Sequence, residues 1–131
     1  MNRARAQAWI EAYGRAWRTK DASGAAALFT EDAIYKSHPF REPNVAREGI
    51  FEYWTKATQD QRDLELSFGR PVVDEDHVVV EWWAAMTADT GEVTLPGALI
   101  LMFTDDGLCK ELREYWHLEP GRHQPFEGWG L

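Results

Sequence analysis

The sequence has one cysteine, few positive charges and no long apolar run, and each of these features excludes some classes of protein. Because Cys109 stands alone, an internal disulfide and a thiolate metal cluster are excluded. Lysine and arginine number 14 against 22 aspartates and glutamates, and the net charge of −8 argues against nucleic acid or an anionic membrane as a partner. No apolar run reaches the roughly 20 residues that cross a bilayer, and residues 1–17 mix charged and apolar side chains unlike a signal peptide. We therefore expect a cytoplasmic protein.

Length and composition fit one domain with its own core. The chain has 131 residues, of which 44% are apolar, and this leaves little room for a second domain. We expect one domain over residues 1–131, ending in an irregular tail over 119–131 that is rich in glycine and proline and pinned to the body by Phe126 and Trp129. Aromatic residues are abundant: the seven Trp, four Tyr and six Phe can build a core, an interface or a ligand cavity.

The first half of the chain has the apolar periodicity of helices. Residues 9–17 carry an apolar stripe with the 3.6-residue period of one helix. Asp21 is suited to cap a shorter second helix that carries the apolar residues of 25–29. A third stripe covers residues 50–58, and Asn44 is its expected cap.

The second half has the alternation typical of strands. Leu64, Leu66 and Phe68 alternate with polar neighbours, which is the period-2 pattern of a half-buried strand. Residues 89–91 and 105–107 are turn sequences suited to tight hairpins. Together with a short segment containing Ile and Tyr, the predicted strands are residues 33–38, 64–68, 77–88, 92–104 and 108–118.

Helices followed by hairpin-linked strands predict an α+β domain, in which the helices pack on one face of an antiparallel sheet. The other face of the predicted sheet is more apolar than the solvent-facing side of a monomer should be. We therefore expect a homodimer through this outer face, with contacts from Trp83, Ile100, Met102 and Tyr115.

The order of the elements and the segment LFTEDAIY, from Leu28 to Tyr35, resemble the nuclear transport factor 2-like superfamily, and more closely its SnoaL-like branch. The resemblance covers about residues 5–118. It implies a cone-shaped fold in which three N-terminal helices pack on a strongly curved, mainly antiparallel sheet that encloses a pocket. The family includes isomerases, polyketide cyclases, epoxide hydrolases, dehydratases and binding domains without catalysis, so the site must be argued separately.

Ketosteroid isomerases of this superfamily use a tyrosine and a protonated aspartic acid as an oxyanion hole, and a second aspartate as the base. By resemblance, Tyr13 stands at the tyrosine position, and Leu99 stands at the position of the protonated acid. Ser37 occupies the position of the base, with His38 beside it. Because two of the three catalytic groups are missing, we expect no ketosteroid isomerase activity. The Arg and Asp pair of the epoxide hydrolases also has no clear counterpart.

Glu114 is the first candidate for chemistry. It shares the alternation of Leu112 and Trp116, which mark the inward face of the last strand, whereas Cys109 and Tyr115 fall on the opposite face. A carboxylate among apolar side chains must be paired, protonated or functional, because removing its charge from water is unfavourable. A raised pKa would suit Glu114 to acid/base work near neutral pH. The alternatives are a structural ion pair, or a bulge that turns the side chain outward.

His38 and Tyr13 are the other catalytic candidates. His38 ends the first predicted strand and could accept a proton, or it could only bond a nearby carbonyl. Tyr13, on the buried helix stripe, could donate a hydrogen bond into the cavity, or it could be a core tyrosine whose hydroxyl is already paired. The residues expected to line a cavity for a flat or cyclic apolar ligand are Trp17, Tyr35, Ser37, Phe40, Trp54, Trp82, Leu99, Leu112 and Trp116.

Motifs for metals and cofactors are missing from the sequence. The four histidines, at positions 38, 77, 117 and 123, have no metal-ligand spacing, so we expect no metal. Neither a glycine-rich phosphate loop nor a Gly-x-Ser-x-Gly motif is present, so we expect no cofactor. Cys109 lacks a local base and is expected to be a small buried or dimer-face residue.

The favoured hypothesis is a cofactor-independent acid/base enzyme that isomerises, cyclises, dehydrates or opens an epoxide of a small apolar cyclic molecule. Glu114 and His38 would share the proton transfer, and Tyr13 would stabilise an oxyanion. Two alternatives remain: a non-catalytic module that binds the same kind of molecule, and a dimeric protein-interaction domain with a filled core.

Overall fold

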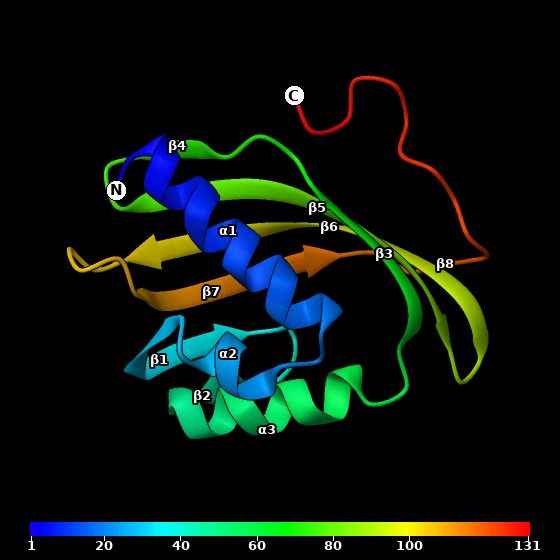
Figure 1. Cartoon of the computed structure of the whole chain (residues 1–131), viewed down its shortest axis with the longest axis horizontal. Coiled ribbons are helices and arrows are strands. Elements are labelled where there is room, and N and C mark those ends of the chain that lie inside the picture. The colour runs from blue at the N-terminus through cyan, green and yellow to red at the C-terminus, as the bar shows by residue number, and fades with distance from the viewer.

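The computed structural model describes all residues from Met1 to Leu131 as three helices and eight strands (Figure 1). The helices are α1 (Arg3–Arg18), α2 (Ala22–Ala26) and α3 (Ala46–Thr58). The strands are β1 (Phe29–Lys36), β2 (Asn44–Val45), β3 (Arg62–Phe68), β4 (Val72–Asp74), β5 (His77–Ala88), β6 (Gly91–Phe103), β7 (Cys109–Trp116) and β8 (Glu119–Pro120). None of the helices combines the length and the apolar character that crossing a membrane requires.

All eight strands belong to one mixed sheet. Its hydrogen-bonded order is β2-β1-β7-β6-β5-β3, with β4 paired to β5 and β8 paired to β6. β1 and β7 run parallel, and every other pair is antiparallel. The long β5–β6 hairpin turns at Gly91, whose φ of 115° is readily adopted only by glycine. The predicted α+β fold with a mainly antiparallel sheet is confirmed.

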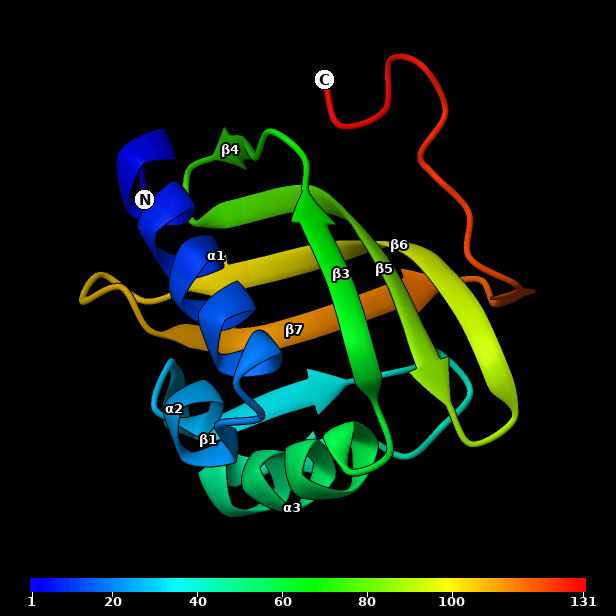
Figure 2. The same cartoon turned by 45° about the vertical axis from the view of Figure 1, so that its right-hand side comes forward.

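The sheet is curved, and the helices lie on its inner side. Figure 2 shows β3 and the far halves of β5 and β6 bending over the space next to α1 and α3. The predicted stripe of α1 is buried there and consists of Trp9, Ile10, Tyr13, Ala16 and Trp17. Burying a large apolar side chain stabilises the fold by about 1.5–3 kcal/mol, so this stripe fixes α1 against the sheet.

One of the two predicted helix caps is present. The Asp21 carboxylate caps α2 by accepting a hydrogen bond of 2.9 Å from the backbone N–H of Gly24, as predicted. The predicted Asn44 cap is wrong, because Val45 holds that position of α3 and makes no side-chain bond. Asn44 belongs instead to β2, and its side-chain amide donates to the carbonyl oxygen of Tyr35 at 3.5 Å.

The predicted strands are confirmed within a few residues, with one error in orientation. The β6–β7 ladder shifts register between Met102 and Phe103, and this bulge changes which side chains face inward at the start of β7. The placement of Cys109 on the face opposite Glu114 is therefore wrong, whereas the expectation of a small buried residue is confirmed. Cys109 is completely buried, and its thiol donates to the carbonyl oxygen of Glu111 at 3.2 Å. Burial raises the pKa of this thiol to about 12, so it is not an activated nucleophile.

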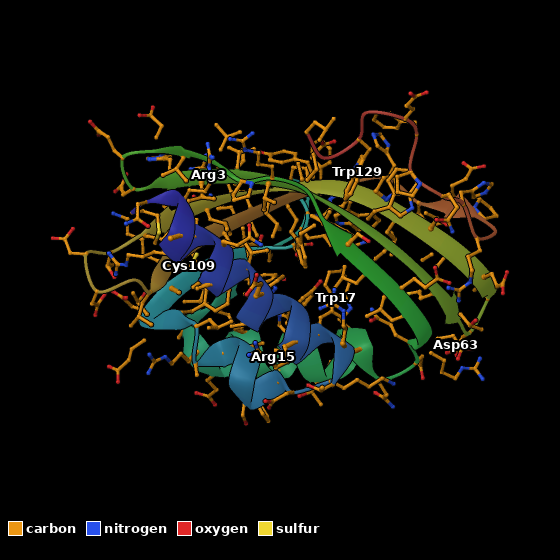
Figure 3. All side chains as sticks on the ribbon, turned by 45° about the horizontal axis from the view of Figure 1, so that its top comes forward. Arg3, Arg15, Trp17, Asp63, Cys109 and Trp129 are labelled. Carbon is orange, nitrogen blue, oxygen red and sulfur yellow. The ribbon has the colours of Figure 1, made fainter.

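The tail crosses the outer face of the sheet, on the side away from the helices. Figure 3 shows Trp129 of the tail on the side of the sheet opposite to Trp17, which lies on the helix side. The rings of Phe126 and Trp129 pack against Trp83, as predicted, with ring centres 6.5 and 6.0 Å away. The indole N–H of Trp83 donates to the carbonyl oxygen of His123 at 2.8 Å. The chain therefore uses Trp83 to hold its own tail.

Candidate functional site

A cavity of about 270 Å³ lies between the helices and the inner face of the sheet. Hydrophobic side chains make up 13 of its 17 lining residues, and Trp17 at the end of α1 projects on this side (Figure 3). The polar members are Thr58, Asp60, Gln61 and Glu114. The space is near the lower end of the range of small-molecule sites, about 300–1,000 Å³. The carboxyl group of Glu114 lies in this apolar cavity, and its position there needs an explanation.

Strand alternation places Glu114 at this cavity. On β7 it lies directly opposite Leu99 of β6, and it shares the inner face with Leu112 and Trp116. Its exposed fraction is 8%, and none of the ion pairs of the protein includes it. The two structural alternatives, an ion pair and an outward-turned side chain, therefore do not describe Glu114.

Two tyrosines from distant parts of the chain hold one oxygen of Glu114. The Tyr35 hydroxyl donates to Oε1 of Glu114 at 2.7 Å, and the hydroxyls of Tyr13 and Tyr35 are 2.8 Å apart. Since the proton of Tyr35 is used on Glu114, Tyr13 donates to the Tyr35 oxygen, and it also lies 3.4 Å from Oε1. Oε2 of Glu114 accepts no hydrogen bond from the protein and is the oxygen left to meet a ligand.

Burial dominates the acidity of Glu114. Desolvation raises its pKa from 4.5 to about 7, because the charged form loses its water, while the hydrogen bonds from Tyr35 and Tyr13 oppose the rise by stabilising the carboxylate. Near neutral pH, both the protonated and the ionised forms are therefore populated. A group with this pKa can both accept and return a proton.

The tyrosines around Glu114 stay protonated. Burial, and next the charge of Glu114, raise the pKa of Tyr13 and of Tyr35 well above the ordinary value for tyrosine. The pKa of Tyr53 is raised for the same two reasons, and the nearby Ser37 hydroxyl opposes the shift. These three hydroxyls therefore stay neutral and do not act as bases.

Tryptophan rings meeting edge to face form much of the cavity wall. Trp17 lies 5.9 Å from Trp54 and 5.4 Å from Trp82, measured between ring centres, at interplanar angles of 86° and 63°. The indole N–H of Trp17 is fixed by the Gln61 side chain at 2.8 Å. The indole nitrogens of Trp54 and Trp82 are buried without a partner in the protein.

The structure brings most of the predicted site residues to this cavity, and others lie behind it. The residues that line it are Tyr13, Trp17, Tyr35, Trp54, Trp82, Glu114 and Trp116. Ser37, Leu99 and Leu112 are buried but are not among the lining residues. They support the wall without forming it.

His38 and Phe40 lie elsewhere. Both line a separate hollow on the outer face of the sheet, and Phe40 is 92% exposed. His38 follows the end of β1, where its Nδ1 accepts from the backbone N–H of Phe40 at 3.2 Å and its ring meets Trp116. The expected pairing of His38 with Glu114 is absent, because the chain leaves the inner side of the sheet once β1 has ended.

Sequence reasoning missed Tyr53, which lines the cavity next to Trp54. Its ring lies 5.1 Å from that of Tyr35. The apolar stripe predicted over residues 50–58 includes Phe51, which is 43% exposed. The spacing of Ile50, Tyr53 and Trp54 at i, i+3 and i+4 is the signal that identifies the buried face.

Candidate metal ligands do not gather in this structure: no three His, Cys, Asp or Glu side chains lie together. The cavity around Glu114 is lined by ionisable and hydroxyl groups, and among them Glu114 has a strongly raised carboxyl pKa.

Three helices packed on a curved, mainly antiparallel sheet define the fold class of this chain, and comparison with known families agrees. The family model of the SnoaL-like domain matches residues 10–112. The chain belongs to the SnoaL-like family. No curated protein matches it by sequence.

Solved structures share the fold at low sequence identity. A hypothetical protein with a ketosteroid isomerase-like fold from Catenulispora acidiphila, in complex with trimethylamine, is 17% identical, with a TM-score of 0.74 over 82% of this chain and 83% of that one. The epoxide hydrolase/cyclase-like enzyme SalBIII, which acts in pyran ring formation in the polyether salinomycin, is 19% identical, with a TM-score of 0.69 over 85% and 92%. A candidate aromatic ring hydroxylase from Novosphingobium aromaticivorans is 20% identical, with a TM-score of 0.73 over 89% and 91%. These likenesses establish the fold and leave the reaction open.

Proposed function

We propose that this protein is a cofactor-independent acid/base enzyme acting on a small apolar cyclic molecule, with Glu114 as the group that moves the proton. The observation that supports the proposal is the carboxyl group itself, which is buried in an aromatic cavity, unpaired with any cation, and held through one oxygen by two tyrosines. A raised pKa with a free second oxygen is what general acid/base catalysis requires.

The proton transfer needs no external reagent. As a carboxylate, Glu114 takes a proton from a carbon or hydroxyl of the substrate through Oε2; as an acid, it returns that proton to another atom of the same molecule. The carboxyl group ends the cycle as it began, and the substrate is isomerised or cyclised with no change in oxidation level. Dehydration and epoxide opening use the same two steps, with water leaving or entering.

Tyr13 and Tyr35 are positioning residues in this proposal. Their hydrogen bonds fix Oε1 and leave Oε2 directed to the ligand, so the role of oxyanion donor predicted for Tyr13 is replaced. His38 is assigned no part, because it does not line the cavity. The epoxide hydrolase/cyclase-like enzyme among the similar structures shows that this fold accommodates such chemistry.

A non-catalytic binding module is the second candidate, and one observation favours it. Both tyrosine protons are used within the Tyr13–Tyr35–Glu114 chain, so neither hydroxyl is free to stabilise a developing oxyanion. The cavity itself counts against the third alternative, a filled core.

The test compares turnover of a panel of cyclic enones and epoxides by the wild type, by Glu114→Gln and by Glu52→Gln. Gln keeps an acceptor for the tyrosines but cannot carry the proton, so we expect at least about a 100-fold loss with Glu114→Gln. Glu52 is exposed on α3, and its variant should behave as the wild type. Saturable binding without turnover would support the binding module, and full activity of Glu114→Gln would exclude Glu114 from the chemistry.

We also propose that the protein is a cytoplasmic homodimer. Ile100 and Met102 are half-buried on the outer sheet face, which leaves an apolar surface to cover. Trp83 and Tyr115 are removed from this proposed contact, because the tail of the same chain covers Trp83, and Tyr115 lines the hollow beside that tail. Sedimentation of the wild type and of Ile100→Glu tests the proposal: a monomeric wild type would contradict it.

A further inference from the structure

A second hollow lies on the outer face of the sheet, between the tail and the segment after β1. Its volume is about 500 Å³. Its floor is made by small side chains of β6: Pro96 lies opposite Trp83 of β5, and Ala98 lies between Glu81 of β5 and Tyr115 of β7. Because small residues stand between larger ones on both neighbouring strands, the sheet is hollowed there. We call this hollow the outer groove.

Aromatic rings form the walls of the outer groove. Phe126 and Trp129 each make an edge contact with Trp83, at interplanar angles of 71° and 79°. Tyr115 and Trp116 line the groove from β7. The groove therefore has a largely aromatic lining, and a cation is attracted to aromatic rings wherever it can lie over a ring face.

Glu81 supplies a negative charge that no cation of the protein balances. It lines the groove and is half-buried, and it belongs to none of the ion pairs. Its Oε1 accepts one hydrogen bond of 3.2 Å from the backbone N–H of Gly130. No lysine or arginine lines the groove, and the one cation that lies over its aromatic rings is the guanidinium of Arg41, 5.6 Å from the ring centre of Trp116. A partly desolvated carboxylate beside aromatic rings disfavours anions and leaves a place for a positive charge.

We propose that the outer groove binds a small organic cation of the methylated ammonium class. Such a cation offers a positive charge to Glu81 and a methyl surface to Trp83 and Trp129, and its weak hydration makes transfer into an aromatic site favourable. The net charge of −8 favours its approach. The site is distinct from the cavity around Glu114, with which it shares only Trp116 as a lining residue. It therefore does not depend on the function proposed for that cavity.

The test titrates the full chain with choline and with its neutral isostere, in which a tert-butyl group replaces the trimethylammonium. The side-chain N–H signals of the tryptophans are followed by NMR. Choline should shift the signals of Trp83 and Trp129 and leave Trp17 unchanged, and it should bind at least about tenfold more tightly than the isostere. Equal affinity of the two compounds, no saturable binding of choline, or shifts at Trp17 in place of Trp83 would overturn the proposal.

Two variants test whether the carboxylate of Glu81 is the charge that binds choline. Glu81→Gln retains an acceptor for the Gly130 N–H, and it should weaken choline binding about tenfold. Glu127→Gln makes the same charge change at an exposed tail residue that does not line the groove, and it should leave choline affinity unchanged. Loss of choline binding in Glu114→Gln would place the ligand in the inner cavity and overturn the proposal. If Glu81→Gln does not fold, the comparison of choline with its neutral isostere in the wild type still tests the proposal.

Discussion

Glu114 is held between two opposing effects at the scale of one residue. Burial in an aromatic cavity favours the neutral acid, whereas the hydroxyls of Tyr35 and Tyr13 favour the carboxylate. The balance leaves the pKa at about 7, so pH controls both the charge of the site and the stability of the protein.

The first prediction concerns stability against pH. In the unfolded protein Glu114 has its ordinary pKa of 4.5, and in the folded protein its pKa is about 7. Between pH 4.5 and pH 7 the folded state therefore binds more protons than the unfolded state. The free energy of unfolding therefore falls as pH rises through this window, by up to about 3 kcal/mol from Glu114. Glu114→Gln should lack this part of the slope and equal or exceed the wild type at pH 8. Denaturant unfolding at several pH values checks this; parallel curves for wild type and variant would contradict it.

The second prediction compares the two tyrosines. Tyr35→Phe removes the donor at 2.7 Å from Glu114, whereas Tyr13→Phe removes one at 3.4 Å. Both substitutions should raise the pKa of Glu114, because Tyr35→Phe removes the hydrogen bond to the carboxylate and Tyr13→Phe removes the donor that polarises the Tyr35 hydroxyl, and Tyr35→Phe should raise it more. The pH profile of turnover, or carbon NMR of the Glu114 carboxyl group if no substrate is found, reports this pKa. A larger rise of the Glu114 pKa in Tyr13→Phe than in Tyr35→Phe would contradict the stronger effect assigned to Tyr35.

At the scale of an element, β6 determines the shape of both sides of the sheet through its small residues. Gly97 lies opposite Trp82 on β5 and Trp116 on β7. A Cβ at Gly97 would lie 2.6 Å from Cε2 of Trp82 and 2.8 Å from the carbonyl oxygen of Tyr115. The close approach of the Trp82 ring to the backbone of β6 thus requires glycine.

The third prediction follows from this contact. Gly97→Ala forces Trp82 to move toward the cavity, so we expect a loss of about 1–3 kcal/mol in stability together with weaker ligand binding in the inner cavity. Gly49→Ala is the matched control, because its Cβ would meet nothing closer than 3.6 Å and it lies inside α3. There alanine should stabilise the helix by about 0.5–1 kcal/mol. Equal thermal midpoints for the two variants would contradict the requirement for glycine at position 97.

At the scale of the whole molecule, one sheet separates two cavities, and the tail shapes the outer one. Arg122 anchors the tail to the sheet: its guanidinium lies 3.2 Å from a carboxylate oxygen of Glu65 and donates to the carbonyl oxygen of Ala85 at 3.3 Å. The Thr94 hydroxyl accepts from the backbone N–H of His123 at 2.9 Å. The tail is therefore irregular in conformation yet fixed in place.

The fourth prediction tests this anchor. Arg122→Ala removes a side chain that is only 19% exposed, although its carboxylate partners are largely solvated, so we expect a loss of about 1–2 kcal/mol. Hydrogen exchange of the amides of residues 121–130 should become faster, while that of α1 stays unchanged. Arg3→Ala, at the start of α1, should alter neither region. Unchanged protection of the tail in Arg122→Ala would show that the aromatic contacts alone hold it.

How much of the fold could be predicted depends on element length. The long strands β5, β6 and β7 show alternation over many residues, and α1 shows its stripe over several turns, so their patterns predict them. β2, β4 and β8 have two or three residues each, too few to show a period, and only pairing to a neighbouring strand makes them strands. The bulge before Cys109 escaped prediction for a related reason, because it is a property of two strands together.

By itself, the sequence determined that Glu114 faces the apolar side of its strand and that Tyr13 lies on a buried helix stripe, because periodicity is local. Only the tertiary structure decided that Tyr13, Tyr35 and Glu114 meet, since 101 residues separate the first of these from the last. It also removed His38 from that group and placed it on the outer face. Hydrogen bonds between distant residues depend on how whole elements pack, and strand or helix periodicity carries no information about that packing.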